Sequence, residues 1–254
     1  MKLLFLGTGT STGVPSLCCD CEICLSADTK NHRLRASVLI QNEGCHTLID
    51  TSTDLRQQCL RYKIKEIHNV LYTHSHADHV HGIDELRSFN FFNKTTIPCF
   101  GRKETLAALK KNFGYIFNPE APTGGGIPKL TLNEIGNETF QLGGVTVTPL
   151  HIIHGKMGIS GYKLDKMAYI TDASKIPDAT KEQLVDLDLL VLNALGYKSH
   201  PTHFCLEEAL AEVEKIKPKR AILTHINHAF DHDRVNGDLP DGVELAYDGM
   251  TVNL

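Results

Sequence analysis

The sequence predicts an α/β fold in which helices cover both faces of a two-sheet core. Short apolar runs rich in β-branched residues recur along the chain, and amphipathic helical patterns lie between them. The strand patterns come in groups early in each half, with helices following, which favours layered sheets. The hydrophobic fraction is 41% of 254 residues, which is enough for a sizeable core, and no low-complexity linker divides the chain. We therefore expect a single domain spanning residues 1–254.

The elements follow in chain order. Strands are expected at Lys2–Leu6, Ser37–Gln41, Thr47–Asp50, Asn69–Tyr72, Gly144–His151, Met167–Thr171, Leu187–Asn193, Arg220–Thr224 and Val243–Ala246. Helices are expected at Ser52–Tyr62, Gly82–Ser88, Lys103–Phe113, Thr180–Val185 and Cys205–Lys215. The last helix has Thr202 or His203 as its expected cap and ends before Pro218. Tyr115–Lys129, with its prolines and glycines, is expected to be a surface loop or lid.

Composition and charge exclude several classes of protein. No run approaches the ~18 apolar residues of a membrane span, so no membrane partner is expected. Met1–Gly7 is too short for an export signal, which predicts a cytoplasmic protein. A net charge of −4 counts against a long nucleic-acid partner. Eight cysteines without an export signal are not expected to form disulfides, and four of them lie between positions 18 and 24.

One short run, from His74 to His79, carries the main chemical signal. It reads His-Ser-His-Ala-Asp-His and directly follows the expected strand Asn69–Tyr72. In an extended turn, residues two apart point to the same side, so His74 and His76 can hold one ion. Asp78 and His79 lie past the turn and can reach a second. Imidazole and carboxylate ligands suit zinc, iron or manganese, and two such ions can activate a bridging hydroxide for hydrolysis.

A site for two metal ions needs more ligands than one loop supplies. His154 lies shortly after the strand expected to end at His151. Asp172 and His225 directly follow the strands that end at Thr171 and Thr224. Each of these residues, like the central run, falls at or just past the C-terminal end of a strand. The sequence therefore predicts that they gather at one edge of the fold.

This pattern resembles the metallo-β-lactamase superfamily, and the resemblance spans essentially the whole chain. It implies a four-layer αββα sandwich with the metals in a cleft along one edge. It also implies that His74, His76 and His154 hold one ion, that Asp78, His79 and His225 hold the other, and that Asp172 bridges them. Asp78 is counted both as a ligand and among the catalytic residues. The expected active-site cofactors are two Zn²⁺ or Mn²⁺, with Fe as a further option, and the resemblance makes a homodimer possible.

A second motif, Cys19-Asp20-Cys21-Glu22-Ile23-Cys24, predicts a structural metal. Three closely spaced thiolates favour tetrahedral zinc, and His228, three residues after His225, offers a fourth ligand. A similar arrangement occurs in the cyclic phosphodiesterases of the phosphonate-degradation pathway. A Cys₃His site would fix the N-terminal loop to the strand end that bears His225. Cys18 has a spacing that lets it replace Cys19.

A third feature, His200-Pro201-Thr202-His203, bears on the reaction. In the phosphodiesterase and RNA-processing branches of the superfamily, a histidine that is not a ligand faces the substrate phosphate, and the match falls on His203, with His200 as its competitor. A cationic imidazole there would protonate the leaving alkoxide. The expected function is therefore hydrolysis of a small phosphodiester, for example a cyclic nucleotide or a ribose cyclic phosphate. The alternatives are a tRNA 3′-processing ribonuclease, a thioester or lactone hydrolase, and a non-catalytic metal sensor.

Overall fold

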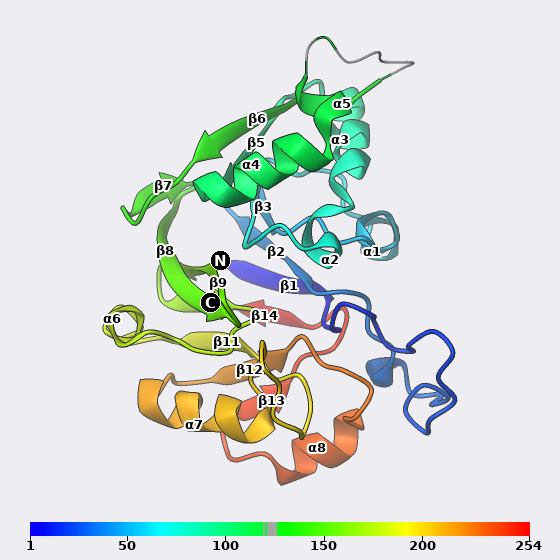
Figure 1. Cartoon of the computed structure of the whole chain (residues 1–254), viewed down its shortest axis with the longest axis vertical. Coiled ribbons are helices and arrows are strands. Elements are labelled where there is room, and N and C mark those ends of the chain that lie inside the picture. The colour runs from blue at the N-terminus through cyan, green and yellow to red at the C-terminus, as the bar shows by residue number, and fades with distance from the viewer. Residues whose placement is uncertain (119, 121–125) are drawn as a thin grey trace.

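The computed structural model describes residues 1–118, 120 and 126–254, and two seven-stranded sheets lie within these ranges (Figure 1). In spatial order, the first sheet consists of β14 (Thr251–Asn253), β1 (Lys2–Gly7), β2 (Ser37–Asn42), β3 (Cys45–Ile49), β4 (Asn69–Leu71), β5 (Ile97–Gly101) and β6 (Leu130–Glu134). The second consists of β13 (Val243–Leu245), β12 (Ala221–Thr224), β11 (Leu189–Asn193), β10 (Met167–Ile170), β9 (Met157–Leu164), β8 (Val145–His154) and β7 (Phe140–Leu142).

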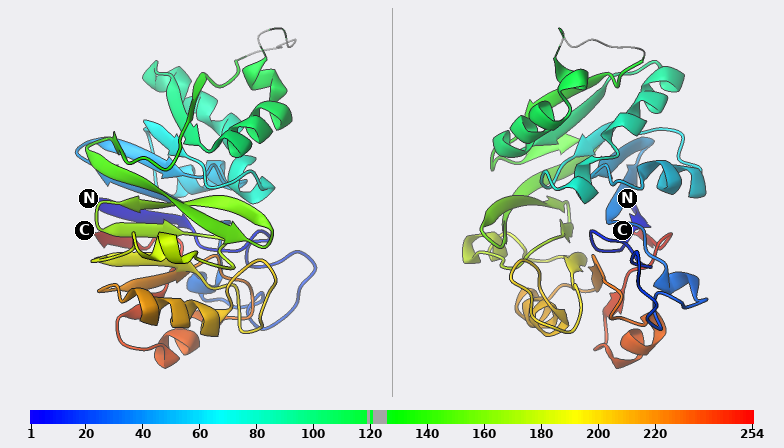
Figure 2. Two further views of the ribbon diagram at one scale, coloured as in Figure 1. Left: turned by 60° about the vertical axis from the view of Figure 1, so that its left-hand side comes forward. Right: turned by 45° about the vertical axis from the view of Figure 1, so that its right-hand side comes forward.

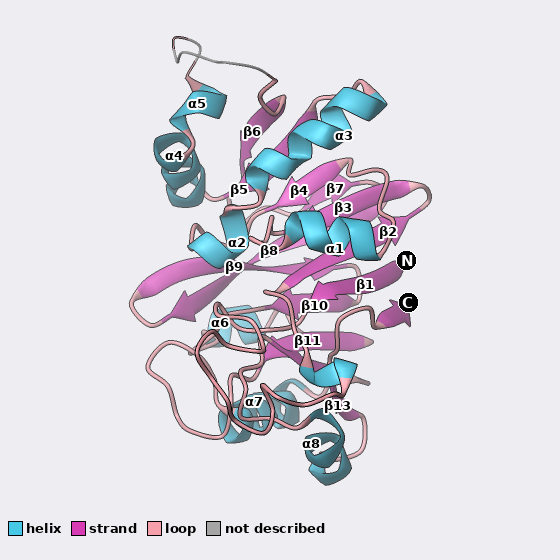
Figure 3. Cartoon of the chain, turned by 90° about the vertical axis from the view of Figure 1, so that its right-hand side faces the viewer, coloured by secondary structure: helices cyan, strands magenta, loops and turns pink. Residues whose placement is uncertain are grey.

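The helices flank this pair of sheets. With the first sheet lie α1 (Leu55–Arg61), α2 (Ala77–Val80), the 3₁₀ turn Ile83–Glu85, α3 (Leu86–Asn93), α4 (Lys103–Asn112) and α5 (Gly114–Phe117). With the second lie α6 (Asp178–Lys181), α7 (Leu206–Ile216) and α8 (His232–Asp238). A further 3₁₀ turn, Thr29–Asn31, interrupts the long β1–β2 connection. Figure 3 shows the helices on the outer sides of the strands.

Three apolar clusters account for the layering. One lies between the sheets and joins Phe5 and Ile49 of the first to Val147 and Tyr169 of the second. Another packs the outer face of the first sheet against α1, α3 and α4, and a third packs the second sheet against α7 and α8. Burying apolar surface between these layers stabilises the fold by about 25 cal/mol for each Å² removed from water. The predicted four-layer sandwich is confirmed.

The direction of the strands determines where the polar residues at their C-terminal ends lie. β3 to β6 are mutually parallel in the first sheet, and β10 to β13 are mutually parallel in the second. The C-terminal ends of parallel neighbours meet at one edge of a sheet, so residues that directly follow these strands come together there. Within the described ranges, no helix has the length and apolarity that a membrane crossing requires.

The expected strands are all present, with ends that shift by a few residues. β5, β6, β7, β9 and β14, together with α2, α5 and α8, were not predicted. Pro98 in β5 and two glycines, Gly158 and Gly161, in β9 weaken the strand pattern, because both residue types disfavour isolated strands. Their pairing with β4 and β8 supplies what local propensity lacks.

Some predicted boundaries are wrong. The helix expected at Gly82–Ser88 is a 3₁₀ turn followed by α3, and the helix expected at Thr180–Val185 is the shorter, earlier α6. The cap of α7 is Cys205, whose backbone N–H donates to the Glu208 carboxylate at 2.9 Å, and not Thr202 or His203. The lid expected at Tyr115–Lys129 lies partly outside the described residues, and its first turn is α5.

Candidate active site

The central run begins at the C-terminal end of β4. Two buried residues separate His74 from the end of β4. His76 is the N-cap of α2, so Asp78 and His79 lie inside this short helix. The sequence analysis did not predict this short helix, although both residues do precede the helical segment expected from Gly82 onward. The helical turn has a useful effect, because it directs Asp78 and His79 back toward the strand ends.

The first group of metal-ligand candidates is His74, His76 and His154. One nitrogen from each ring lies within 4.8 Å of the others. Nδ1 of His154, the last residue of β8, donates to the carbonyl of Thr202 at 2.7 Å, which leaves Nε2 as its free lone pair. Burial lowers the pKa of His74 well below its usual value. Burial also lowers the pKa of His76, so both of these rings favour the neutral form that binds a metal.

The second group is Asp78, His79, Asp172 and His225, and all four side chains are buried. Nε2 of His79 lies 3.2 Å from Asp78 and 3.3 Å from Asp172. Nε2 of His225 lies 3.2 Å from Asp172 and 3.8 Å from Asp78. Burial alone would lower the pKa of His79, but Asp172, Asp78 and Asp50 hold it well above its usual value. The carboxylates therefore favour a positive charge at this nitrogen.

Asp172 lies between the two groups. It belongs to the second group and also forms a set within 4.8 Å with His154 of the first and with His203. The rings of His74 and His79, one from each group, have centroids 4.2 Å apart. Burial would raise the pKa of Asp172, but the charges of His225 and His79 hold it well below its usual value. An ionised carboxylate at this position suits a bridging ligand.

The donor set fits divalent cations. Nε2 of His74, His79 and His225 is buried and makes no well-directed hydrogen bond among the described residues, although carboxylate oxygens lie 3.2–3.8 Å from the last two. Leaving a buried polar nitrogen unpaired costs about 1–3 kcal/mol, so three at one place indicate a missing partner. Four imidazoles and two carboxylates, with the exposed His76 as a further donor, match the preferences of zinc, manganese or iron.

Asp50 is a site residue that the sequence analysis missed. It follows β3 as Asp172 follows β10, and this shared placement was the available signal. Its carboxylate accepts from Nδ1 of His79 at 2.8 Å, and from the backbone N–H and the hydroxyl of Thr73 at 2.8 and 2.7 Å. Asp50 thereby turns Nε2 of His79 toward Asp78 and Asp172.

Replacing Asp50 with Asn is expected to weaken metal binding by about 10- to 100-fold, because partners behind a ligand fix its orientation and basicity. The measurement is competition with a chelator of known affinity. Asp241→Asn, which changes an exposed aspartate, is the matched control. Equal metal affinity in the two variants would show that Asp50 does not support the site.

His203 lies next to both groups. Its Nε2 is 3.0 Å from Asp172, its ring stacks on that of His225 with centroids 4.9 Å apart, and the ring of His154 is 4.8 Å away. Burial lowers its pKa, and the hydrogen bond to Asp172 opposes that shift. His200 is exposed and reaches His203 only through Nδ1, at 3.2 Å. Of the two candidates, His203 is the one placed at the centre.

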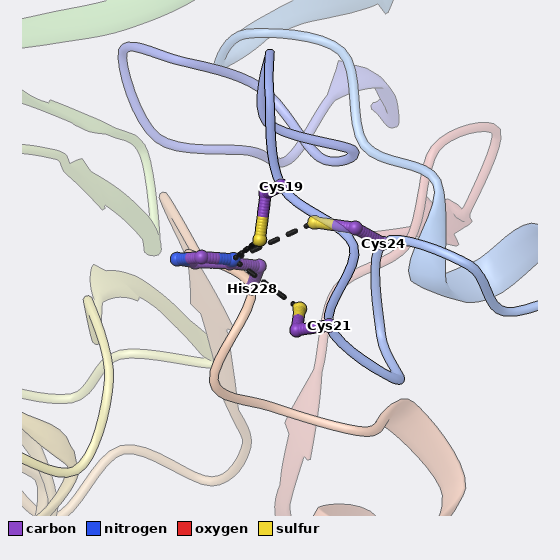
Figure 4. Close-up of side chains that lie close together, drawn as sticks. All are labelled: Cys19, Cys21, Cys24 and His228. Carbon is purple, nitrogen blue, oxygen red and sulfur yellow. Dashed lines mark hydrogen bonds between the residues drawn. The ribbon is translucent and has the colours of Figure 1, made fainter.

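The cysteine motif forms a separate cluster (Figure 4). Sγ of Cys19, Cys21 and Cys24 lies 3.2, 3.4 and 3.5 Å from Nδ1 of His228. Ligands of a tetrahedral zinc with ordinary Zn–S and Zn–N bonds are ~3.5 Å apart, so the spacing fits this ion. The backbone N–H of Cys24 contributes most to lowering the pKa of Cys21 to about 6, and burial raises the pKa of Cys24 to about 11.

Cys18 is exposed and lies outside this cluster. Its φ of 60° turns the chain so that Cys19, not Cys18, faces His228. The cluster joins the β1–β2 connection to the segment after β12, and Figure 2 shows this blue loop beside the orange and red C-terminal part. The loop Gly7–Gly13, which holds three glycines, adds to the same junction, since the Thr10 N–H donates to the Ile226 carbonyl at 3.0 Å.

Known proteins share the fold of this chain. The model of the beta-lactamase superfamily domain matches residues 46–226. A crystal structure described as a new diphosphatase from the PhnP family is 40% identical, with a TM-score of 0.93, covering 100% of this chain and 97% of that one. Zinc-bound PqqB from Methylobacterium extorquens shares the fold at 21% identity and a TM-score of 0.81, covering 100% of both chains.

Among curated proteins, an octanoyltransferase of Porphyromonas gingivalis is 37% identical over 98% of this chain. The alignment takes in 51% of that protein, so the chain spans about half the length of this relative. Ribonuclease Z of Bacillus subtilis is 24% identical over 100% of this chain and 99% of its own. At that distance the likeness concerns the fold alone.

Proposed function

Since the chain belongs to the metallo-β-lactamase superfamily of hydrolases, we propose that it hydrolyses small phosphodiesters, with cyclic nucleotides as the model substrate class. The observation that carries the proposal is the place of His203. Its Nε2 lies 3.0 Å from Asp172, beside both candidate ligand groups, and it belongs to neither. Hydrolysis of a thioester leaves such a group without a clear role, because the departing thiolate is a weak base that needs little protonation.

The roles divide among the residues as follows. His74, His76 and His154 would hold one cation, Asp78, His79 and His225 another, and Asp172 would contact both. Bound divalent ions supply an acidified water and neutralise the charge of a phosphate. Asp50 and the Thr202 carbonyl keep Nε2 of His79 and of His154 directed inward. His203 delivers a proton to the departing oxygen, which an alkoxide requires because it is a poor leaving group.

Hydrolysis of a diphosphate is the second candidate, and the 40% identical neighbour described as a diphosphatase favours it. The same ligand set serves both reactions. They differ in the leaving group. A departing phosphate is a far weaker base than an alkoxide, so it needs less protonation. The dependence of the rate on His203 therefore separates the two candidates.

The test compares wild type with His203→Ala on a 2′,3′-cyclic nucleotide, a dinucleoside diphosphate and bis-p-nitrophenyl phosphate, with a thioester and a lactone alongside. Zinc- and manganese-loaded forms are both assayed. We expect His203→Ala to lower kcat on the cyclic nucleotide by about 10²- to 10⁴-fold, the usual effect of a general acid. The effect on bis-p-nitrophenyl phosphate, whose leaving group needs no acid, is expected to be small.

His200→Ala is the matched control, since it removes a neighbouring imidazole that does not reach Asp172. Metal content should be the same in both variants. If His200→Ala lowered kcat on the cyclic nucleotide more than His203→Ala does, His200 and not His203 would be the acid. Wild-type turnover confined to the thioester or the lactone would contradict the proposed function.

A further inference from the structure

One residue between the two histidines of the His200-Pro201-Thr202-His203 segment contacts two site imidazoles, those of His154 and His203, and also the exposed His200. The Thr202 carbonyl accepts from Nδ1 of His154 at 2.7 Å. Its hydroxyl oxygen lies 2.8 Å from Nδ1 of His203 and 3.1 Å from Nδ1 of His200. All three contacts use Nδ1, and in His203 the opposite nitrogen, Nε2, is the one that faces Asp172.

The pairing of atoms determines which way the rings of His154 and His203 face. A carbonyl only accepts, so Nδ1 of His154 must carry the hydrogen and Nε2 must present its lone pair. A hydroxyl both donates and accepts, so it can pair with Nδ1 of His203 whichever of the two carries the hydrogen. In either case the ring is held with Nε2 toward Asp172, at 3.0 Å.

The surroundings of Thr202 fix it in turn. Gly155, in the β8–β9 turn, has φ +61°, and a Cβ there would lie 2.8 Å from the Thr202 methyl carbon. The turn therefore packs directly on this side chain. Two residues further on, the Phe204 N–H donates to the Ala173 carbonyl at 2.7 Å, which ties the segment to the residue after Asp172. The direction of the hydroxyl is thus set by packing on one side and by backbone bonding on the other.

We propose that Thr202 is a positioning residue: its carbonyl selects the tautomer of His154, and its hydroxyl aims His203 at the reacting centre. This rests on the proposed function only for the consequence of aiming His203, and the hydrogen bonds themselves can be tested without substrate. The carbonyl survives any substitution at this position, so the role of the hydroxyl can be isolated.

The experiment uses Thr202→Val, which removes the hydroxyl and keeps the shape, and Thr202→Ser, which keeps the hydroxyl. On a 2′,3′-cyclic nucleotide, Thr202→Val is expected to lower kcat by about 10-fold, the equivalent of one hydrogen bond, with KM within about twofold. Thr202→Ser should restore most of the rate. On bis-p-nitrophenyl phosphate both variants should resemble wild type, and all should keep the same metal content.

The second readout is the ¹⁵N NMR spectrum of the histidine rings in the zinc-loaded proteins without substrate. Thr202→Val should shift the Nδ1 signals of His203 and His200 and leave those of His154 in place, because only the hydroxyl is lost. Unchanged His203 signals would overturn the proposal, as would an equal loss of rate on both substrates or an unchanged rate on the cyclic nucleotide.

The outcomes separate this inference from the function on which it draws. If His203→Ala slows the cyclic nucleotide reaction and Thr202→Val does not, the positioning role falls and the proposed function stands. If the wild type cleaves no phosphodiester, the proposed function falls, and the ring spectra alone decide whether Thr202 holds His203.

Discussion

Asp172→Asn is expected to lose most of its active-site metal and on the order of 10³-fold or more in kcat/KM, which corresponds to the several kcal/mol that a metal supplies. Asp172 is buried, and its two oxygens lie 3.0 to 3.3 Å from nitrogens of His203, His225 and His79. An amide at this position keeps the shape of the side chain and removes its charge. Metal content by mass spectrometry and kinetics on a phosphodiester are the measurements.

Asp241→Asn, an exposed change of the same chemistry, should behave as wild type. Circular dichroism of the Asp172→Asn protein checks that the fold is intact, because the strands around this residue are packed by apolar contacts on both faces. A variant that is folded, retains the wild-type metal content and remains active would remove Asp172 from the centre of the site.

The second large effect is expected at the cysteine cluster. The connection between β1 and β2 runs from residue 8 to residue 36 with only one 3₁₀ turn, and its own apolar cluster is small: Val14, Ile23 and Cys24, with Cys19 and Cys21 packed against it. A long irregular segment with so little core needs another constraint, and a bound metal supplies one. Cys24→Ser should lower the unfolding temperature by roughly 10 °C, equivalent to several kcal/mol in a chain of this size.

The same variant should lose one tightly bound zinc and become sensitive to proteases between residues 8 and 36, which mass spectrometry of the fragments would locate. Cys18→Ser is the control, since Cys18 is the exposed neighbour that lies outside the cluster. If the two substitutions have equal effects on stability and zinc content, the cluster is not a metal site.

Features of the fold and the site could be predicted where neighbouring residues in the sequence determine them. The ligand candidates that follow a strand, such as His74, Asp172 and His225, were predicted because parallel strands bring their C-terminal ends together and the chemistry of the residues is visible in the sequence. The fold class followed from the strand and helix patterns in the same way. The structure places these side chains in two adjoining groups.

What escaped prediction depends on contacts between distant segments. Asp50 supports His79 across 29 positions, and Thr202 supports His154 across 48. The His200-Pro201-Thr202-His203 segment drew attention to its histidines, and nothing local indicated that Thr202 contacts His154. The choice between Cys18 and Cys19 rests on the backbone conformation at Cys18, where φ is 60°. Strand β9 is stabilised by its pairing with β8 and not by its own glycine-containing sequence.

Metal stoichiometry tests the central claim most directly. Protein purified without chelators and loaded with zinc is predicted to hold about three ions per chain, two in the active site and one in the cysteine cluster. Cys24→Ser should retain about two of them, and Asp172→Asn mainly the one bound by the cysteines. A wild-type protein that saturates with a single ion would contradict the two-metal active site.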